Sequence, residues 1–193
     1  AVAVWKDLPH STGPESGVRS KRRPVEAQWI AEESRRILES NPKLSVGVIS
    51  FYAAQVDELF LCMERVGLAE QREDGERYIA EPYRERSDTK GRRSERLRFG
   101  TVDAFQGKEF DVVLLSMTRS NDIVPDNEQG VRRKWGHLTL ENRLCVAMSR
   151  QQRLLVVVGD ADMFKDDVLA NEPGVSALRK FHMFCGGAHG VRI

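Results

Sequence analysis

The chain alternates between two spacings of apolar residues, and this alternation predicts its fold class. Short runs of β-branched and aliphatic residues occupy 1–5 and 44–51, and continuous apolar runs of this length are typical of strands buried on both faces. In 24–40 and 53–66 the apolar residues recur at helical spacing instead. A repeated strand–helix order predicts a parallel sheet with right-handed crossovers. We therefore expect an α/β fold with a mostly parallel sheet flanked by helices.

The second half of the chain returns to this alternation. A helix is expected to begin near Thr139, whose hydroxyl is a candidate N-cap. The polar stretch 121–135 predicts a loop, and the glycine-containing tail 185–193 predicts a loose end. The other elements expected here are strands at 97–102, 111–117 and 154–160 and a short helix at 175–184.

Residues 68–98 interrupt the pattern with dense mixed charge and few apolar anchors. We interpret them as a charged insertion between core elements, with one short strand around 78–80. Arginines near its end offer a second interpretation, a basic finger, but the interleaved acidic residues favour a solvated loop. These arginines are Arg92, Arg93, Arg96 and Arg98. A chain of 193 residues is long enough for one α/β domain with such an insertion, so a single domain is predicted over 1–193.

Composition limits the class of protein without indicating a function. The net charge is +1, so any nucleic-acid binding depends on a local surface rather than on overall charge. Cys62, Cys145 and Cys185 have no framework spacing and predict reduced thiols packed as small buried side chains. No apolar run approaches the roughly 18 residues of a membrane span, and the start lacks a signal peptide and an initiator methionine. We expect a segment of a longer intracellular protein, cytoplasmic, nuclear or associated with a nucleoid, with no membrane partner.

Several familiar sites are missing from the sequence. A phosphate-binding P-loop requires G-x-x-x-x-G-K-[ST], and Gly107-Lys108 resembles only its end, because Glu109 replaces the hydroxyl residue. Carboxylates beside a predicted strand, such as Glu109 and Asp111, raise the alternative of a metal-dependent nuclease, but their spacing is irregular. The C-terminal residues lack the paired spacing of a structural zinc site, although three of them could ligate a metal: His182, Cys185 and His189. No metal site is predicted.

The most informative stretch is 100–111, a polar loop with a glycine between two predicted strands. Loops at strand ends are where α/β proteins hold functional side chains. Arg150 ends the helix that precedes the strand at 154–160, where its guanidinium could pair bidentately with phosphate oxygens. An arginine that complements the dipole at the end of a helix explains the same position equally well. Spacing alone leaves both interpretations open.

Three segments resemble motifs of superfamily 1 helicases of the Upf-like branch, in the order of that family. Residues 102–111 (VDAFQGKEFD) resemble motif V, residues 142–150 (NRLCVAMSR) resemble motif VI, and residues 46–55 (VGVISFYAAQ) are similar to motif IV. The resemblance covers about residues 1–165. It implies the second, C-terminal RecA-like domain of a motor that binds ATP with Mg²⁺ between two domains. The P-loop and the metal ligands would belong to an N-terminal RecA-like domain of the same parent chain.

The resemblance also implies roles for individual residues. Arg150 would be the arginine finger that reaches the γ-phosphate, and Glu109 would contact the nucleotide at its ribose. These roles predict that Thr101, Glu109 and Arg150 lie along one open face. Further positions are implied at ATP for Gln106, Gly107 and Arg143, and at the nucleic-acid strand for Thr101 and Tyr52.

One position departs from the family pattern. Some relatives follow the motif IV glutamine with a second arginine that reaches ATP, whereas Val56 follows Gln55 here. The loop arginines Arg19, Arg22 and Arg23 are the candidates to replace it.

The sequence thus predicts the C-terminal motor domain of an ATP-dependent helicase or translocase acting on single-stranded or duplex DNA or RNA, inactive in hydrolysis as an isolated fragment. The alternative is a non-catalytic nucleic-acid-binding or scaffold domain with the same fold. That alternative predicts that Arg150 and Glu109 are buried in internal pairs rather than directed into a cleft.

Overall fold

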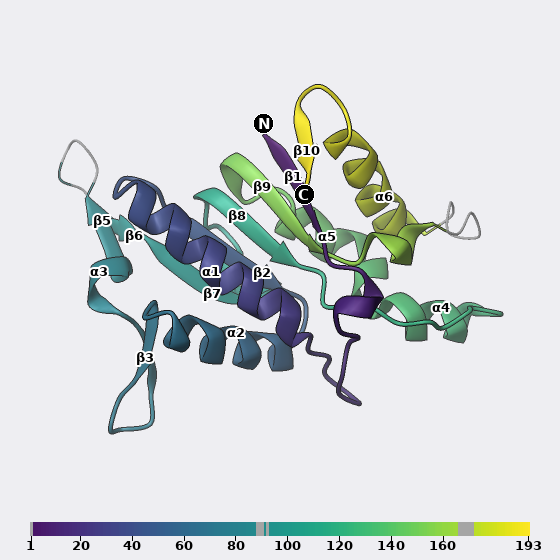
Figure 1. Ribbon diagram of the computed structural model, residues 1–193, viewed down its shortest axis with the longest axis horizontal. Coiled ribbons are helices and arrows are strands. Elements are labelled where there is room, and N and C mark those ends of the chain that lie inside the picture. Colours follow the sequence, from purple (N-terminus) through teal and green to yellow (C-terminus); the bar gives the residue numbers. More distant parts are fainter. Residues whose placement is uncertain (1, 88–90, 92, 166–171) are drawn as a thin grey trace.

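A six-stranded sheet forms the centre of the molecule, and its strands all run in parallel (Figure 1). The computed structural model describes residues 2–87, 91, 93–165 and 172–193. The strand order is β10-β1-β9-β8-β2-β7. These strands span Ala3–Asp7 (β1), Val46–Ser50 (β2), Leu97–Thr101 (β7), Phe110–Ser116 (β8), Gln151–Gly159 (β9) and Gly190–Arg192 (β10). The predicted α/β class with a parallel sheet is confirmed.

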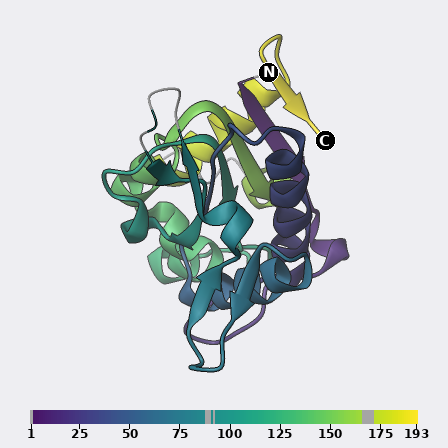
Figure 2. The same ribbon diagram turned by 90° about the vertical axis from the view of Figure 1, so that its left-hand side faces the viewer.

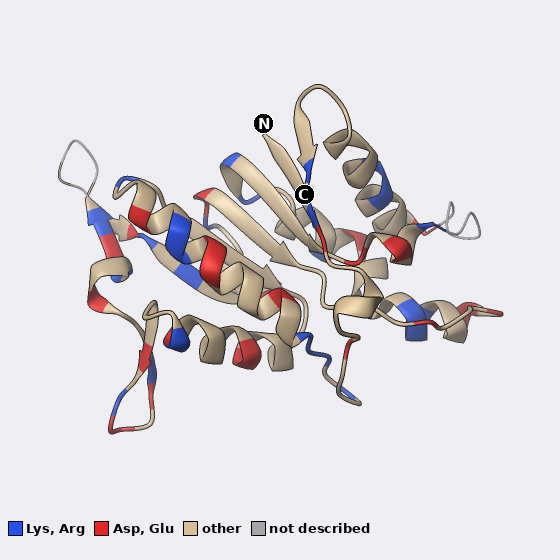
Figure 3. Ribbon diagram, in the orientation of Figure 1, with Lys and Arg blue, Asp and Glu red and all other residues tan. Residues whose placement is uncertain are grey.

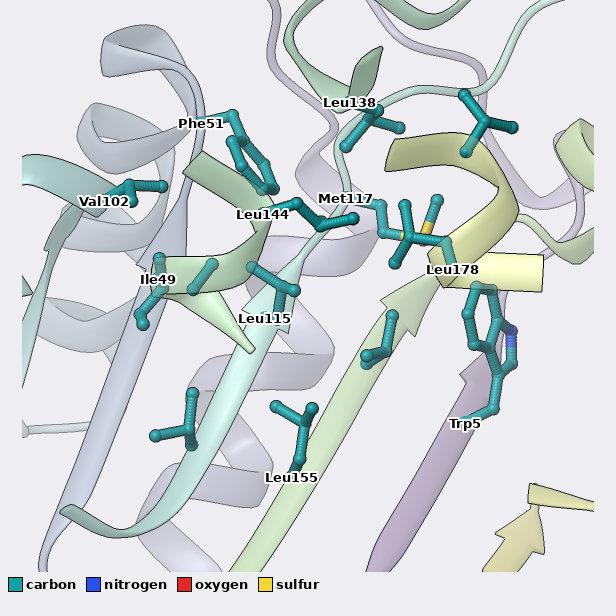
Figure 4. Close-up of a cluster of buried hydrophobic side chains, with 14 of the residues drawn as sticks. Trp5, Ile49, Phe51, Val102, Leu115, Met117, Leu138, Leu144, Leu155 and Leu178 are labelled. Carbon is teal, nitrogen blue, oxygen red and sulfur yellow. The ribbon is translucent and has the colours of Figure 1, made fainter. Parts of the chain in front are cut away.

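Helices cover both faces of the sheet and create two apolar cores. The helices span Pro24–Ser40 (α1), Ala53–Arg65 (α2), Glu128–Trp135 (α4), Glu141–Ala147 (α5) and Pro173–Cys185 (α6), with 3-10 turns at His10–Thr12 (η1), Val102–Phe105 (η2), Gly136–Thr139 (η3) and Ala161–Phe164 (η4). Because side chains alternate across a strand, Leu114 of β8 joins the core under α1 and α2, whereas Leu115 joins the core under α5 and α6. Figure 4 shows Leu115 in the same cluster of buried side chains as Leu144 of α5 and Leu178 of α6.

The stretch predicted as a loop at 121–135 contains α4, so that prediction is wrong. The side chain of Asn127 accepts a hydrogen bond from the Gly130 amide at 2.9 Å and caps the helix. At the other end, Trp135 is fully buried. A helix of 8 residues with an internal glycine and several exposed arginines shows too little apolar periodicity to be recognised.

Two further local predictions are corrected. The hydroxyl of Thr139 donates to the Gly136 carbonyl at 2.9 Å within η3, so it does not cap α5. The tail predicted as loose at 185–193 returns to the sheet as β10, where the Ile193 amide donates to the Trp5 carbonyl at 2.9 Å. An edge strand of 3 residues carries too little pattern to be predicted.

The short strand predicted around 78–80 is present, and the insertion predicted at 68–98 contains three further strands that complete two antiparallel hairpins (Figure 2). They consist of β3 (Ala69–Gln71) with β4 (Arg77–Ile79) and β5 (Glu85–Ser87) with β6 (Arg93–Glu95), joined by the short helix α3 (Glu81–Arg84). Charged residues occur along both hairpins (Figure 3). Of the arginines considered for a basic finger, Arg93 and Arg98 pair with glutamates of the insertion and Arg96 is buried. Arg92 lies outside the described residues.

The cysteines are free thiols, and two of them are buried as predicted. Cys145 is the exception, because its position on the short helix α5 faces outward while Leu144 beside it enters the core. Among the described residues, no helix combines the length and apolar character needed to cross a membrane.

Candidate functional site

The predicted site residues divide between the two edges of the parallel sheet. We call the edge where the strands begin the amino edge and the edge where they end the carboxyl edge. Thr101 ends β7 in register with Ser50, which in turn is in register with Ser116 at the end of β8. Phe110 begins β8 six residues earlier, which at the rise of a parallel strand is about 20 Å away. Thr101 therefore lies at the carboxyl edge and Glu109 at the amino edge, not along one open face as expected.

In the segment between these edges, two buried aromatic rings flank residues 106–109. Phe105 and Phe110 are buried with their ring centroids 5.6 Å apart. Between them, the side chains of residues 106–109 are exposed. Gly107 has φ +72°, a left-handed conformation that glycine adopts without strain. Residues 102–109, which we call the coupling segment, therefore present exposed groups from a fixed backbone.

Glu109 and Arg150 come together at the amino edge. The Phe110 amide donates to the Arg150 carbonyl at 3.0 Å, so the two residues belong to neighbouring backbones. The half-buried Arg150 side chain donates to the Val146 carbonyl at 3.1 Å and to the Ser149 hydroxyl at 2.8 Å. Within the described part of the chain, no carboxylate forms an ion pair with Arg150.

Arg143 lies away from this pair, near the start of α5. Its guanidinium is 3.0 Å from Asp103 of η2, and both side chains are well exposed. Arg150 lies beyond the other end of α5, three residues after Ala147. Arg143 therefore links α5 to the coupling segment instead of joining Glu109.

Tyr52 lies at the carboxyl edge, in the wall of a cavity of about 1020 Å³. Its hydroxyl accepts hydrogen bonds from Arg119 at 3.3 Å and from the His137 amide at 3.1 Å. Burial, with Arg143 and Arg119 nearby, lowers the pKa of His137, so its ring is neutral at neutral pH. Further cations line the cavity: Arg19, Lys21, Arg132 and Arg133. Two carboxylates, Glu128 and Glu172, also line the cavity. The excess of cations over carboxylates suits phosphate oxygens.

The loop arginines do not supply a second cation beside Arg150. Arg23 is fully buried, where it pairs with Glu26 at 3.1 Å and donates to the Leu8 carbonyl at 2.7 Å. Arg19 lines the cavity of the carboxyl edge, and Arg22 lies 3.8 Å from Glu58 on α2. Of the three candidates to replace the missing ATP-binding arginine, Arg23 is therefore enclosed in the protein interior and does not face a cleft.

The motif IV glutamine has a structural role that sequence reasoning missed. Gln55 accepts a hydrogen bond from the Arg23 amide at 2.7 Å and donates to the Ser116 hydroxyl at 3.0 Å. That hydroxyl in turn donates to Glu26 at 2.7 Å. Burial raises the pKa of Glu26, although Arg23 and these donors oppose it. The buried polar side chains thus tie the residue before α1 to the first turn of α2 and to the end of β8.

The carboxylates considered for a nuclease do not converge. Asp111 is held by Ser45, Arg86 and Arg153, and Glu109 accepts a hydrogen bond from Gln152 at 3.2 Å. Among the described residues, no group of three His, Cys, Asp or Glu side chains is placed to hold a metal ion.

Comparisons with known proteins agree with the motif pattern. A family model described as an AAA domain matches residues 2–162. Helicase required for RNAi-mediated heterochromatin assembly 1 from Schizosaccharomyces pombe is 29% identical over 148 residues, 76% of this chain and 12% of that protein. DNA polymerase alpha-associated DNA helicase A from Saccharomyces cerevisiae is 34% identical over 125 residues, 64% of this chain and 13% of that protein. RNA helicase Mov10l1 from Homo sapiens is 26% identical over 141 residues, 73% of this chain and 9% of that protein. The chain thus spans only about an eighth or less of the length of these curated relatives.

Proposed function

Because this chain belongs to the AAA domain family, as the C-terminal RecA-like domain of a superfamily 1 helicase of the Upf-like branch, we propose that it is the second motor domain of an ATP-dependent helicase or translocase. In this proposal the amino edge faces ATP and an N-terminal RecA-like domain of the same parent chain. The carboxyl edge holds part of the nucleic-acid strand.

The single observation that carries this proposal is the state of Arg150. Its guanidinium is half-buried and, among the described residues, is held by a carbonyl and a hydroxyl and by no carboxylate. Its backbone lies next to Phe110, the residue that follows the exposed Glu109. A scaffold domain with no use for this cation would be expected to bury it in an internal ion pair. An unneutralised guanidinium at a domain edge is instead suited to a phosphate group delivered by a partner.

The chemistry at the amino edge is charge stabilisation. Phosphoryl transfer spreads negative charge over the equatorial oxygens of the transferred group, and an arginine finger supplied by a second domain stabilises that charge. Since Arg150 is on one domain and the P-loop and Mg²⁺ ligands on the other, hydrolysis depends on closure of the cleft. Glu109 is assigned to the ribose, with Gln106 and Gly107 beside it. This domain alone is then inactive.

At the carboxyl edge, Thr101 and Tyr52 are assigned to the nucleic-acid strand, together with the cations of the neighbouring cavity. The named relatives include a DNA helicase and an RNA helicase. Binding of matched single-stranded DNA and RNA by the parent enzyme distinguishes the two substrates, because only RNA offers a 2′-hydroxyl.

Arg150→Ala in the parent enzyme tests the proposal. We expect ATP binding to change little and hydrolysis to slow on the order of 10³-fold or more, as for other arginine fingers. Arg35→Ala is the matched control, because Arg35 pairs with Glu39 on the exposed side of α1. Near-normal turnover of Arg150→Ala would refute the assignment.

A further inference from the structure

The register between β8 and β9 shifts next to Arg150. Phe110 pairs with Gln151, but Val112 pairs with Leu154, so two steps along β8 face three steps along β9. A bulge of this kind redirects the side chains around it, and bulges are over-represented beside functional sites. Because Arg150 comes directly before the first of these pairs, the bulge determines where its backbone enters the sheet.

Side chains from both strands hold this bulge. Gln152 donates to Glu109 at 3.2 Å. Arg153 places its Nε 2.9 Å from Oδ1 of Asp111. Glu109 and Asp111 are alternate residues of one segment, so the two contacts join the start of β8 to the residues that follow Arg150.

The second oxygen of Asp111 connects the bulge to the insertion. Oδ2 accepts hydrogen bonds from the amide and the hydroxyl of Ser45, each at 3.0 Å, and pairs with Arg86 of β5. Asp111 is only 3% exposed. Burial opposes its charge, but the donors outweigh burial and hold the pKa of Asp111 below its usual value. One buried carboxylate therefore joins β2, β8, β9 and the insertion.

We propose that Arg86 is a positioning residue for the amino edge: through Asp111 it fixes the bulge, and thereby the relative placement of Glu109 and Arg150. This inference rests on the proposed function of that edge. It gives the insertion a role in ATP hydrolysis, in place of the nucleic-acid finger considered from the sequence. Glu109 and Arg150 depend on such support because the contacts of their own side chains are few and local.

Because of the location of Arg86, the effect of its loss on the positions of Glu109 and Arg150 can be distinguished from an effect on general stability. Its guanidinium reaches Asp111 and the Lys43 carbonyl from a hairpin outside both apolar cores. Loss of this guanidinium leaves the cores and the main sheet intact. It removes one cation from Asp111 while Ser45 and Arg153 remain.

The experiment compares Arg86→Met, Arg86→Lys and Arg93→Met in the parent enzyme. Arg93 is the matched control, because it lies on the opposite strand of the same hairpin and pairs with Glu85. Misplacement of catalytic groups by about 1 Å costs up to 10²-fold, so we expect Arg86→Met to lower kcat for ATP hydrolysis roughly 10-fold to 100-fold. Arg86→Lys should restore part of the rate. The affinity of Arg86→Met for single-stranded nucleic acid in the absence of ATP should not change. Arg93→Met should have the same kcat and the same affinity as the unmodified enzyme.

The outcomes separate this inference from the function on which it rests. Equal kcat values for Arg86→Met and Arg93→Met, measured below the melting temperature of both, overturn the positioning role. So does a parallel loss of strand affinity and kcat, since that result indicates general loss of structure. Arg150→Ala is assayed in the same series: normal turnover there overturns the proposed function, whereas a large loss there with no effect of Arg86→Met overturns this inference alone.

Discussion

At the scale of the residue, the lack of a side chain at Gly47 makes room for the two aromatic rings that anchor the coupling segment. A Cβ at Gly47 would lie 2.8 Å from Phe110 and 2.9 Å from Phe105, which is closer than carbon atoms pack. Gly47→Ala therefore displaces both aromatic anchors, and we expect a loss of about 1–3 kcal/mol in the free energy of unfolding, typical of overpacking. Urea denaturation of the chain measures this loss.

Gly107→Ala provides the comparison for Gly47→Ala. Apart from its chain neighbours, none of the described residues has an atom within 4 Å of a Cβ at Gly107, so the cost comes from the positive φ, about 1–2 kcal/mol. The Gly47 substitution should disturb the environment of Phe105 and Phe110 in NMR spectra, and the Gly107 substitution should not. Unchanged ring resonances in Gly47→Ala would contradict the close packing.

The Asp111 carboxylate gives a pH-dependent prediction at the same scale. Its pKa is held below the ordinary value of 3.8, so the folded state favours the charged form facing Arg86, Arg153 and Ser45. The resulting stability is complete above pH 3.8 and is lost as the pH falls through the lower folded-state pKa. Asp111→Asn should therefore be less stable than the unmodified chain at neutral pH, by about 1–3 kcal/mol. The difference should narrow in acid unfolding below pH 3.8, and a constant difference would exclude the carboxylate charge as its source.

At the scale of the element, sequence periodicity predicted the long segments well. α1 is found at Pro24–Ser40 and α2 at Ala53–Arg65, close to the expected bounds, because each buries a continuous apolar stripe. The short elements were missed for the opposite reason. The helix α4, the hairpins of the insertion and the edge strand β10 depend on caps, ion pairs and contacts with distant strands, none of which leaves a period in the sequence.

The candidate site was predictable only in part, because a motif gives the order of residues but not the direction of the chain. Arg150 and Glu109 meet through the parallel pairing of β8 with β9, which the strand–helix order already implied. Thr101 was expected along the same open face, yet the coupling segment carries the chain back across the sheet, so Thr101 lies at the other edge. The role of Arg23 was also not visible, since a buried arginine and an exposed one look alike in a loop of mixed composition.

At the scale of the whole molecule, the proposed function assigns one ligand to each edge of the sheet. Glu109 lies about 20 Å from Thr101 along the strand direction, and residues 102–109 span that distance. The segment is anchored by buried rings and, through Asp103 and Arg143, is linked to the helix that leads to Arg150. In the proposed function, these packed elements connect the two edges, and coupling between the sites requires that they adopt two discrete arrangements.

This separation predicts that charge can be removed from the carboxyl edge without loss of basal hydrolysis. Arg132 and Arg133 are exposed at the cavity beside Tyr52, far from Arg150. Each phosphate contact contributes about 0.7 to 0.9 to the slope of log affinity against log salt. Changing both arginines to glutamine in the parent enzyme should weaken strand binding and reduce this slope by roughly 1.5. ATP hydrolysis without nucleic acid should remain unchanged.

The matched control for this double variant removes the same charge from the opposite side of the sheet. Arg35 and Arg36 are exposed on α1 and pair with Glu39 and Glu33, so changing both to glutamine alters the net charge equally without touching the cavity. If the nucleic-acid strand crosses the carboxyl edge, only the variant at the cavity has a reduced slope of log affinity against log salt. The counterions released on binding come from the phosphates that are bound there. Equal slopes for the two double variants would mean that the strand takes another path, and the assignment of Tyr52 and Thr101 would fall while that of Arg150 would stand.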